Sequence, residues 1–212
     1  DELTSVFRFS VVLKHKIQIT SLFAAVRDID KRFPYYKVLL KRGFFWYYLE
    51  SACFLTPVTV DDKIPCRRFE KEGPLLRILV TDNRISAEFS HMLTDGGGAH
   101  EYFKTLLTQY FINRKIDVPP DFKYMKPSEE PDPEEFEDAY NRFFKERIPV
   151  NTRRPEAFHL PFPLNGKPRL GIISATLPVA VLKEKAKEKQ VNLTVYLAAV
   201  YFYAIQQIFE DP

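Results

Sequence analysis

The opening residues change from a strand-like to a helix-like hydrophobic pattern. Residues 6–14 are rich in β-branched and aromatic side chains, which predicts a β-strand. A helix is expected next, with Thr20 or Ser21 as its N-cap and Pro34 marking its end. One face of this helix carries apolar side chains, namely Leu22, Phe23, Val26, Ile29 and Phe33.

Two pairs of apolar runs follow, and each pair predicts a β-hairpin. The first pairs residues 38–41 with residues 44–49, and the two residues between them form the turn. The second pairs residues 75–80 with residues 85–92 across Asp82-Asn83, which suit a tight turn. A long amphipathic helix is then predicted from apolar residues at helical spacing, namely Ala99, Tyr102, Phe103, Leu106, Leu107, Tyr110 and Phe111.

The composition changes after Arg114, where a connector rich in proline and acidic residues is predicted over residues 117–165. Nine of the 16 prolines lie between Pro119 and Pro163, and residues 129–138 hold seven acids and no base. This acidic run is compatible with a docking site for a basic partner. The pattern favours a solvated connector that leads into an exposed helix near residues 134–147.

Regular structure is expected to return in residues 166–212. A strand is predicted around residues 170–177, followed by a charged surface helix over residues 179–190. Residues 194–209 are apolar almost all round, so this last helix must be covered on every side. It therefore lies in a core, or a segment outside this sequence packs on it.

Composition places the chain among folded globular proteins, since it is 45% hydrophobic and 28% charged with a net charge of +3. No basic stripe with interleaved aromatic residues suggests a nucleic-acid partner. Cys53 and Cys66 have neither disulfide-framework nor metal-ligand spacing, so two buried or half-buried free thiols are expected.

No membrane span is expected, because the longest apolar run, residues 195–205, is too short to cross a bilayer. No signal peptide opens the chain, so we expect a cytoplasmic protein. Its first residue is Asp1 rather than Met, which suggests that it starts inside its gene product.

Among the four histidines, His91 stands in the pattern most suggestive of chemistry. It ends a predicted strand and begins the run His91-Met92-Leu93-Thr94-Asp95-Gly96-Gly97-Gly98, which holds three of the seven glycines. Such clustering indicates positive φ angles or a close approach to the backbone. His15, His100 and His159 are most simply surface residues.

A strand that turns at glycines into a helix leaves backbone N–H groups free beside the histidine. Strand alternation places His91 on the apolar side with Ile85, Ala87 and Phe89. A half-buried imidazole is mostly neutral at pH 7, as a general base requires. The alternative is a structural histidine that precedes a turn.

His91 to Gly96 resembles the HxxxDG active-site motif shared by BAHD plant acyltransferases, nonribosomal condensation domains and alcohol acetyltransferases. The likeness extends to Arg32-Phe33-Pro34 near the start and to residues 182–205, which are similar to the end of that superfamily's first lobe. The resemblance implies an α/β layered sandwich, one chloramphenicol-acetyltransferase-like half with a mixed sheet covered by helices. It is nearest to the amino-terminal lobe of an alcohol acetyltransferase.

The chain departs from the superfamily at two points. Ser90 replaces the second histidine of nonribosomal condensation domains, which favours a hydroxyl acceptor over a carrier-bound amine. The sequence also ends where the second lobe would begin, so that lobe is an expected partner from the same polypeptide. Chloramphenicol acetyltransferase carries the motif near its carboxyl terminus, which disfavours a trimer of that kind here.

The resemblance implies acyl transfer, most simply of acetyl, from acyl-CoA as co-substrate to an alcohol hydroxyl. His91 would act as general base, backbone N–H groups of Gly96 and Gly97 would stabilise the oxyanion, and Asp95 would hold the loop through an arginine of the missing lobe. No metal and no permanently bound cofactor are expected. The alternatives are a condensation-type, lipid or natural-product acyltransferase with another donor or acceptor, and a non-catalytic scaffold domain. Residues 1–212 alone are expected to fold, to lack activity and to self-associate.

Overall fold

The computed structural model describes residues 5–62, 64, 66–137, 139–145, 156, 159, 163 and 173–210. The chain divides into two compact units, Asp1–Phe144 and Lys145–Pro212.

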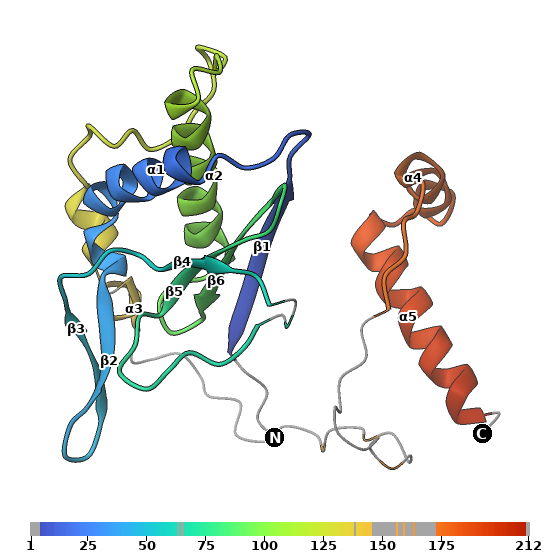
Figure 1. Ribbon diagram of the computed structural model, residues 1–212. Coiled ribbons are helices and arrows are strands. Elements are labelled where there is room, and N and C mark those ends of the chain that lie inside the picture. Colours follow the sequence, from blue (N-terminus) through green and yellow to red (C-terminus); the bar gives the residue numbers. More distant parts are fainter. Residues whose placement is uncertain are drawn as a thin grey trace. The chain divides into compact units, whose positions relative to one another are not determined.

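The first unit is built on a mixed four-stranded sheet with the strand order β1-β6-β5-β4. β1 and β6 are antiparallel, as are β6 and β5, whereas β5 and β4 are parallel. β2 and β3 form a separate antiparallel pair (Figure 1). The elements in chain order are β1 (Val6–Val12), α1 (Ile19–Arg32), the 3-10 helix η1 (Pro34–Tyr36), β2 (Val38–Arg42), β3 (Tyr47–Ser51), β4 (Val58–Val60), β5 (Leu76–Val80), β6 (Arg84–Ser90), α2 (Gly96–Asn113), the 3-10 helix η2 (Pro133–Phe136) and α3 (Ala139–Phe143).

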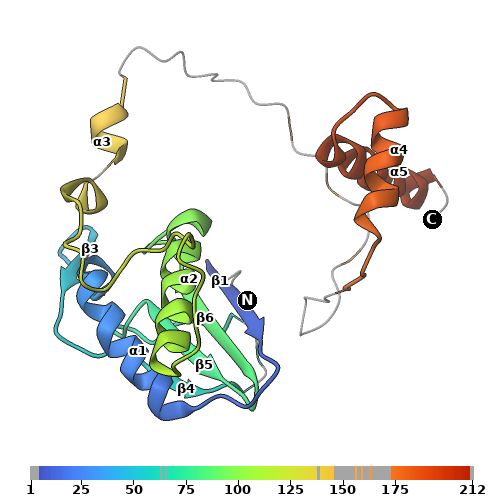
Figure 2. The same cartoon turned by 90° about the horizontal axis from the view of Figure 1, so that it is seen from above.

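Helices α1 and α2 pack together on one face of this sheet and make the hydrophobic core with it (Figures 1 and 2). Strand β6 contributes Ile85, Ala87 and Phe89, which are fully buried. The expected layered α/β arrangement, with a mixed sheet covered by helices, is confirmed. The other buried members of this core are Leu22, Ala25, Val26, Ile29, Phe33, Tyr36, Leu76, Ile78, Val80, Ala99, Tyr102, Phe103, Leu106 and Tyr110.

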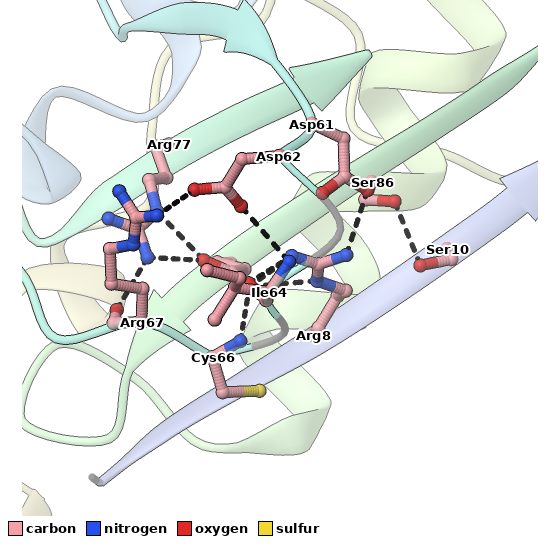
Figure 3. Close-up of polar contacts among 10 residues, drawn as sticks. Arg8, Ser10, Asp61, Asp62, Ile64, Cys66, Arg67, Arg77 and Ser86 are labelled. Atoms are coloured by element: carbon pink, nitrogen blue, oxygen red, sulfur yellow. Dashed lines mark hydrogen bonds and ion pairs between the residues drawn. The ribbon is translucent and has the colours of Figure 1, made fainter. Parts of the chain in front are cut away.

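The opposite face of the sheet is polar, and a buried carboxylate is at its centre. Glu88 is fully buried and accepts hydrogen bonds from Arg8 Nε at 2.7 Å and from Arg77 Nε at 2.7 Å. The backbone N–H of Cys66 donates to the same carboxylate at 2.6 Å, and Arg8 also pairs with Asp61 at 2.9 Å. Figure 3 shows these arginines beside the covering segment, whose described residues are Asp61, Asp62, Ile64, Cys66 and Arg67. Two guanidinium groups therefore balance two buried carboxylates, Glu88 and Asp61.

The elements predicted for the first unit are confirmed, with shifts at their ends. Helix α1 begins earlier than expected: its N-cap is Gln18, and Ser21 donates to the Gln18 side chain at 2.8 Å instead of capping the helix. Phe23 is exposed, while the other four residues of the predicted face are buried. The first hairpin turns at residues 43–46, because β3 starts only at Tyr47.

Within the first unit, an acidic residue of the connector binds the end of α1 and η1. Glu135 Oε1 accepts from Arg32 Nη2 at 2.7 Å, and Glu135 Oε2 accepts from Tyr35 Oη at 2.5 Å. Asp132 and Glu135 also form a capping box that starts η2. The exposed helix expected near residues 134–147 consists of two short elements, η2 and α3. This part of the acidic run is thus bound in place by a buried arginine.

The second unit contains two described helices, α4 (Val179–Glu188) and α5 (Leu193–Glu210). Residues 173–177 of the predicted strand have no regular structure, and its residues 170–172 lie outside the described residues. Within its own unit, α5 buries none of its side chains. Of the described helices, none is long and apolar enough by itself to cross a membrane, and α4 with α5 meets the criteria only as a pair bent by 85°.

The Glu135 contact predicts a stability loss in acid. Arg32 and the Tyr35 hydroxyl hold the pKa of Glu135 at about 2, below the ordinary value of 4.5. Because the pKa of Glu135 is lower in the folded chain than in the unfolded chain, ionised Glu135 stabilises the fold at pH values above its ordinary pKa. This stabilisation is lost as the pH falls from about 5 towards 2. Glu135→Gln should therefore lower the free energy of unfolding at pH 7 by up to roughly 3 kcal/mol. It should also flatten the pH dependence between pH 5 and 3, measured by urea unfolding.

Glu130→Gln is the matched control, since Glu130 is an exposed acid of the same segment. This variant should keep the wild-type pH profile. Identical profiles for the wild type and Glu135→Gln would mean that the contact does not stabilise the fold.

Candidate functional site

The candidate site is the turn that joins β6 to α2. Strand β6 ends at Ser90, and the backbone N–H of Leu93 donates to the Ser90 carbonyl at 2.9 Å. His91 extends the pairing with β1 by one more bond, since its N–H donates to the Ser5 carbonyl at 2.7 Å. The backbone of His91 is therefore held at the end of the sheet.

The imidazole of His91 is exposed, so the expectation of a half-buried side chain is wrong. Its ring lies on the ring of Phe7, with 4.2 Å between centroids and 35° between planes. Tyr102 packs edge-on against Phe89, the preceding core-facing residue of β6. The chain turns away after Ser90, so α2 does not extend over His91. Strand alternation predicted the correct face of the sheet for His91, but α2 covers this face only as far as Phe89.

Asp95 is the N-cap of α2. Its Oδ1 accepts a hydrogen bond from the Gly98 N–H at 2.9 Å, which satisfies one donor of the first helical turn. A carboxylate at this position also interacts favourably with the positive end of the helix. Among the described residues, no arginine forms an ion pair with Asp95, and the arginine that the resemblance implies stays a prediction.

Close packing, and not an unusual backbone angle, accounts for one of the three glycines. No described glycine has positive φ, so that part of the expectation is wrong. A Cβ on Gly98 would lie 2.8 Å from Tyr36 Oη and would also collide with Thr94 Oγ1. A Cβ on Gly96 would meet nothing within 4 Å. The fold therefore requires glycine at position 98 and leaves position 96 unconstrained.

Tyr36 and Thr94 hold the turn against η1, a contact that sequence reasoning missed. Tyr36 Oη donates to Thr94 Oγ1 at 2.9 Å. Burial raises the pKa of the Tyr36 hydroxyl, which therefore keeps its proton and can donate. The two residues are 58 positions apart, and no motif or period links them.

The backbone N–H groups of Gly96 and Gly97 begin α2. The first N–H groups of a helix have no acceptor within the helix. Both residues are exposed, so they lie on a part of the surface that a ligand can reach. An exposed imidazole and two helix-start amides thus come from one seven-residue stretch.

The other histidines do not join this site as a cluster. His100 is exposed in the first turns of α2, where its ring lies 6.2 Å from Phe9 and its Nδ1 lies 3.7 Å from Glu101 Oε1. His15 and His159 are exposed as well. Within the described part of the chain, no three His, Cys, Asp or Glu side chains are placed to hold a metal ion. Cys66 is half-buried as expected, whereas Cys53 is exposed.

No protein-family profile and no curated protein matches the chain. Several solved structures do resemble it. SgcC5 of Streptomyces globisporus is 18% identical with a TM-score of 0.41, over 55% of this chain and 32% of that protein. The starter condensation domain of rhizomide synthetase RzmA is 12% identical with a TM-score of 0.42, over 57% and 36%. Polyketide synthase associated protein 5 from Mycobacterium tuberculosis is 14% identical with a TM-score of 0.45, over 57% and 32%. This chain spans about a third of the length of the solved structures that it matches.

The two glycines at the ends of the triplet should respond differently to alanine. Gly98→Ala should lower the free energy of unfolding by about 1–3 kcal/mol, because the new methyl group collides with Thr94 and Tyr36. Gly96→Ala should keep or raise it by up to about 1 kcal/mol, because alanine is the better helix former. Urea unfolding measures both, and equal losses would contradict the packing described for Gly98.

The N-cap role of Asp95 predicts a second contrast. Asp95→Ala should lower the free energy of unfolding by about 0.5–2 kcal/mol, whereas Asp95→Asn should retain most of it because asparagine caps equally well. Thermal unfolding separates the two variants. A stable Asp95→Asn protein that has lost acyl transfer would assign the carboxylate a direct role beyond capping.

Proposed function

We propose that this chain is the motif-bearing lobe of an acyltransferase, in which His91 is the general base. The acyl group, most simply acetyl, would come from acyl-CoA and would pass to the hydroxyl of a small alcohol. A second lobe of the same polypeptide would complete the site. What supports the proposal is the motif of this chain and the geometry of its turn.

The observation that carries the proposal is that folding explains Asp95 and its neighbours Thr94 and Gly98 but not His91. Asp95 caps α2, Thr94 accepts from Tyr36, and Gly98 fits where no side chain can. The imidazole of His91 makes no hydrogen bond to any described residue and is exposed, with the Phe7 ring as its contact. An aromatic or aliphatic side chain would serve that contact equally well, so a functional reason for the imidazole is needed.

Gly96 is the second motif residue that the fold leaves unexplained. A side chain there would point into open space, and alanine would suit the start of a helix better. Glycine at this position keeps the surface beside the first amides of α2 clear. A substrate oxygen could then approach the N–H groups of Gly96 and Gly97.

These groups suit the chemistry of acyl transfer. His91 would accept the proton of the acceptor hydroxyl while the oxygen attacks the thioester carbonyl carbon. The N–H groups of Gly96 and Gly97 would donate to the oxyanion that forms. When the tetrahedral species collapses, the C–S bond breaks and the proton on His91 passes to the CoA thiolate. The ester and free CoA are the products.

The exposure of His91 explains why a second lobe is part of the proposal. A base in open water loses the orientation and the exclusion of solvent that make it effective. The lobe described here supplies the base and the amides from one side. The opposite side must supply contacts to CoA and the wall that excludes water.

The rival proposal is a non-catalytic domain that keeps the motif for its turn. The structural roles of Thr94, Asp95 and Gly98 favour it, because the turn would need these three residues without any reaction. The two proposals differ at His91, which the turn does not need.

His91→Ala in the polypeptide that carries both lobes should lower the rate of acyl transfer by roughly a hundred- to ten-thousand-fold. Its unfolding midpoint should stay at the wild-type value, because the imidazole is exposed. The rate is followed as CoA released from acetyl-CoA in the presence of a panel of alcohols.

His100→Ala is the matched control, since His100 is also exposed and also lies beside a phenylalanine of β1. This variant should keep the wild-type rate. Wild-type turnover by His91→Ala would exclude the general-base role, and no turnover by the wild type with any thioester would favour the non-catalytic domain.

A further inference from the structure

The tip of the β2–β3 hairpin exposes a continuous run of aromatic side chains. The N–H of Gly43 donates to the Trp46 carbonyl at 2.7 Å, so the loop closes with Phe44 and Phe45 at its apex. These two phenylalanines are 87% and 89% exposed, and Trp46 is 61% exposed. Single exposed apolar residues are ordinary, but three consecutive aromatic residues at a projecting tip indicate a binding surface.

The hairpin register orders the side chains by distance from the apex. The first rung behind the turn pairs Arg42 with Tyr47, and the next pairs Lys41 with Tyr48. Both tyrosines are exposed. Since a strand rises about 3.3 Å per residue, both rungs lie within about 10 Å of the apex.

This order matches the polarity profile of a membrane surface. Apolar aromatic rings at the apex suit the boundary of the acyl chains, and tyrosine and tryptophan favour the headgroup region. A basic side chain beside them suits anionic lipid headgroups. Residues 41–49 contain two cations and no acid. Lys41 pairs with Glu72 at 3.2 Å, so exposed Arg42 is the cation of the tip that complements an anionic surface.

We propose that the β2–β3 hairpin is a membrane-docking tip, which inserts Phe44, Phe45 and Trp46 into the interface of a bilayer that contains anionic lipids. A protein partner fits less well, because stable protein interfaces use roughly 20–30 residues a side and this tip offers about six. Surface-bound elements bury their apolar side chains about 5–10 Å deep. This depth is similar to the distance from the apex of the hairpin to its first two residue pairs. The docking role does not depend on the acyltransferase proposal.

Trp46 is a built-in reporter, since it is the single tryptophan of the 212 residues. The probes are vesicles of phosphatidylcholine alone and of phosphatidylcholine mixed with phosphatidylserine. With the mixed vesicles the protein should co-sediment, the emission of Trp46 should shift to the blue, and lipids brominated on the acyl chain should quench it. Binding to phosphatidylcholine alone should be weaker.

Tip variants test whether the hairpin itself inserts. The double variant Phe44→Ser with Phe45→Ser should weaken vesicle binding by at least about a hundredfold, because two exposed rings no longer leave water. Arg42→Glu should weaken binding to the mixed vesicles by roughly fivefold or more. An unchanged unfolding midpoint shows that each variant is folded.

Matched controls lie on other surfaces of the first unit. Phe122→Ser removes an exposed phenylalanine and Arg27→Glu reverses an exposed charge, and both should bind vesicles as the wild type does. His91→Ala should also bind normally, which separates docking from catalysis.

Three results would overturn the proposal. One is the absence of co-sedimentation with the mixed vesicles, and another is binding that the tip variants leave unchanged. The third is a blue-shifted Trp46 in the absence of lipid together with self-association that the double tip variant abolishes. That result would show that the tip binds protein.

Discussion

Strand β6 holds a carboxylate that has no access to solvent. Glu88 accepts from the guanidinium groups of Arg8 and Arg77 and from the backbone of Cys66, so one side chain connects β1, β5 and the covering segment. Removal of one partner from such a cluster leaves a buried charge unbalanced, which typically costs about 3–5 kcal/mol. The opposite face of β6 lies in the apolar core. A strand fixed on both faces is a rigid support, and the residue that follows it is His91.

The sequence predicted β1, α1, β2, β3, β5, β6 and α2 in order, because each has a clear period. It missed β4, whose three residues are too few to show a period. It was less informative about what each face meets. The polar side of β6, with Ser86 and Glu88, has the pattern of a solvated face. The structure buries it, because Arg8 and Arg77 arrive from neighbouring strands with matching charge. Partners such as Arg32 and Glu135, 103 positions apart, leave no local signal.

The strand-to-helix junction that carries His91 was predicted correctly, whereas the predicted half-burial of His91 was wrong. Periodicity placed His91 on the correct side of the sheet, at a junction that leads into α2. It could not show that α2 extends over Phe89 and leaves the next core-facing residue open, since this depends on the direction in which the helix departs. The backbone N–H groups at the start of α2 could be expected from the order of strand, turn and helix in the sequence. The hydrogen bond from Tyr36 could not, because a tyrosine two residues after Arg-Phe-Pro is equally typical of ordinary core packing.

The turn needs some residues of this run and not others, which affects how similar sequence patterns are interpreted in other proteins. Thr94, Asp95 and Gly98 stabilise the turn, so selection for a stable fold would keep them with or without a reaction. Under the proposed mechanism, only selection for a reaction would keep the imidazole of His91 and the empty space at Gly96. A pattern search that scores all positions equally therefore reports the fold. The histidine and the unobstructed glycine are the positions whose loss would mark a relative without the proposed reaction.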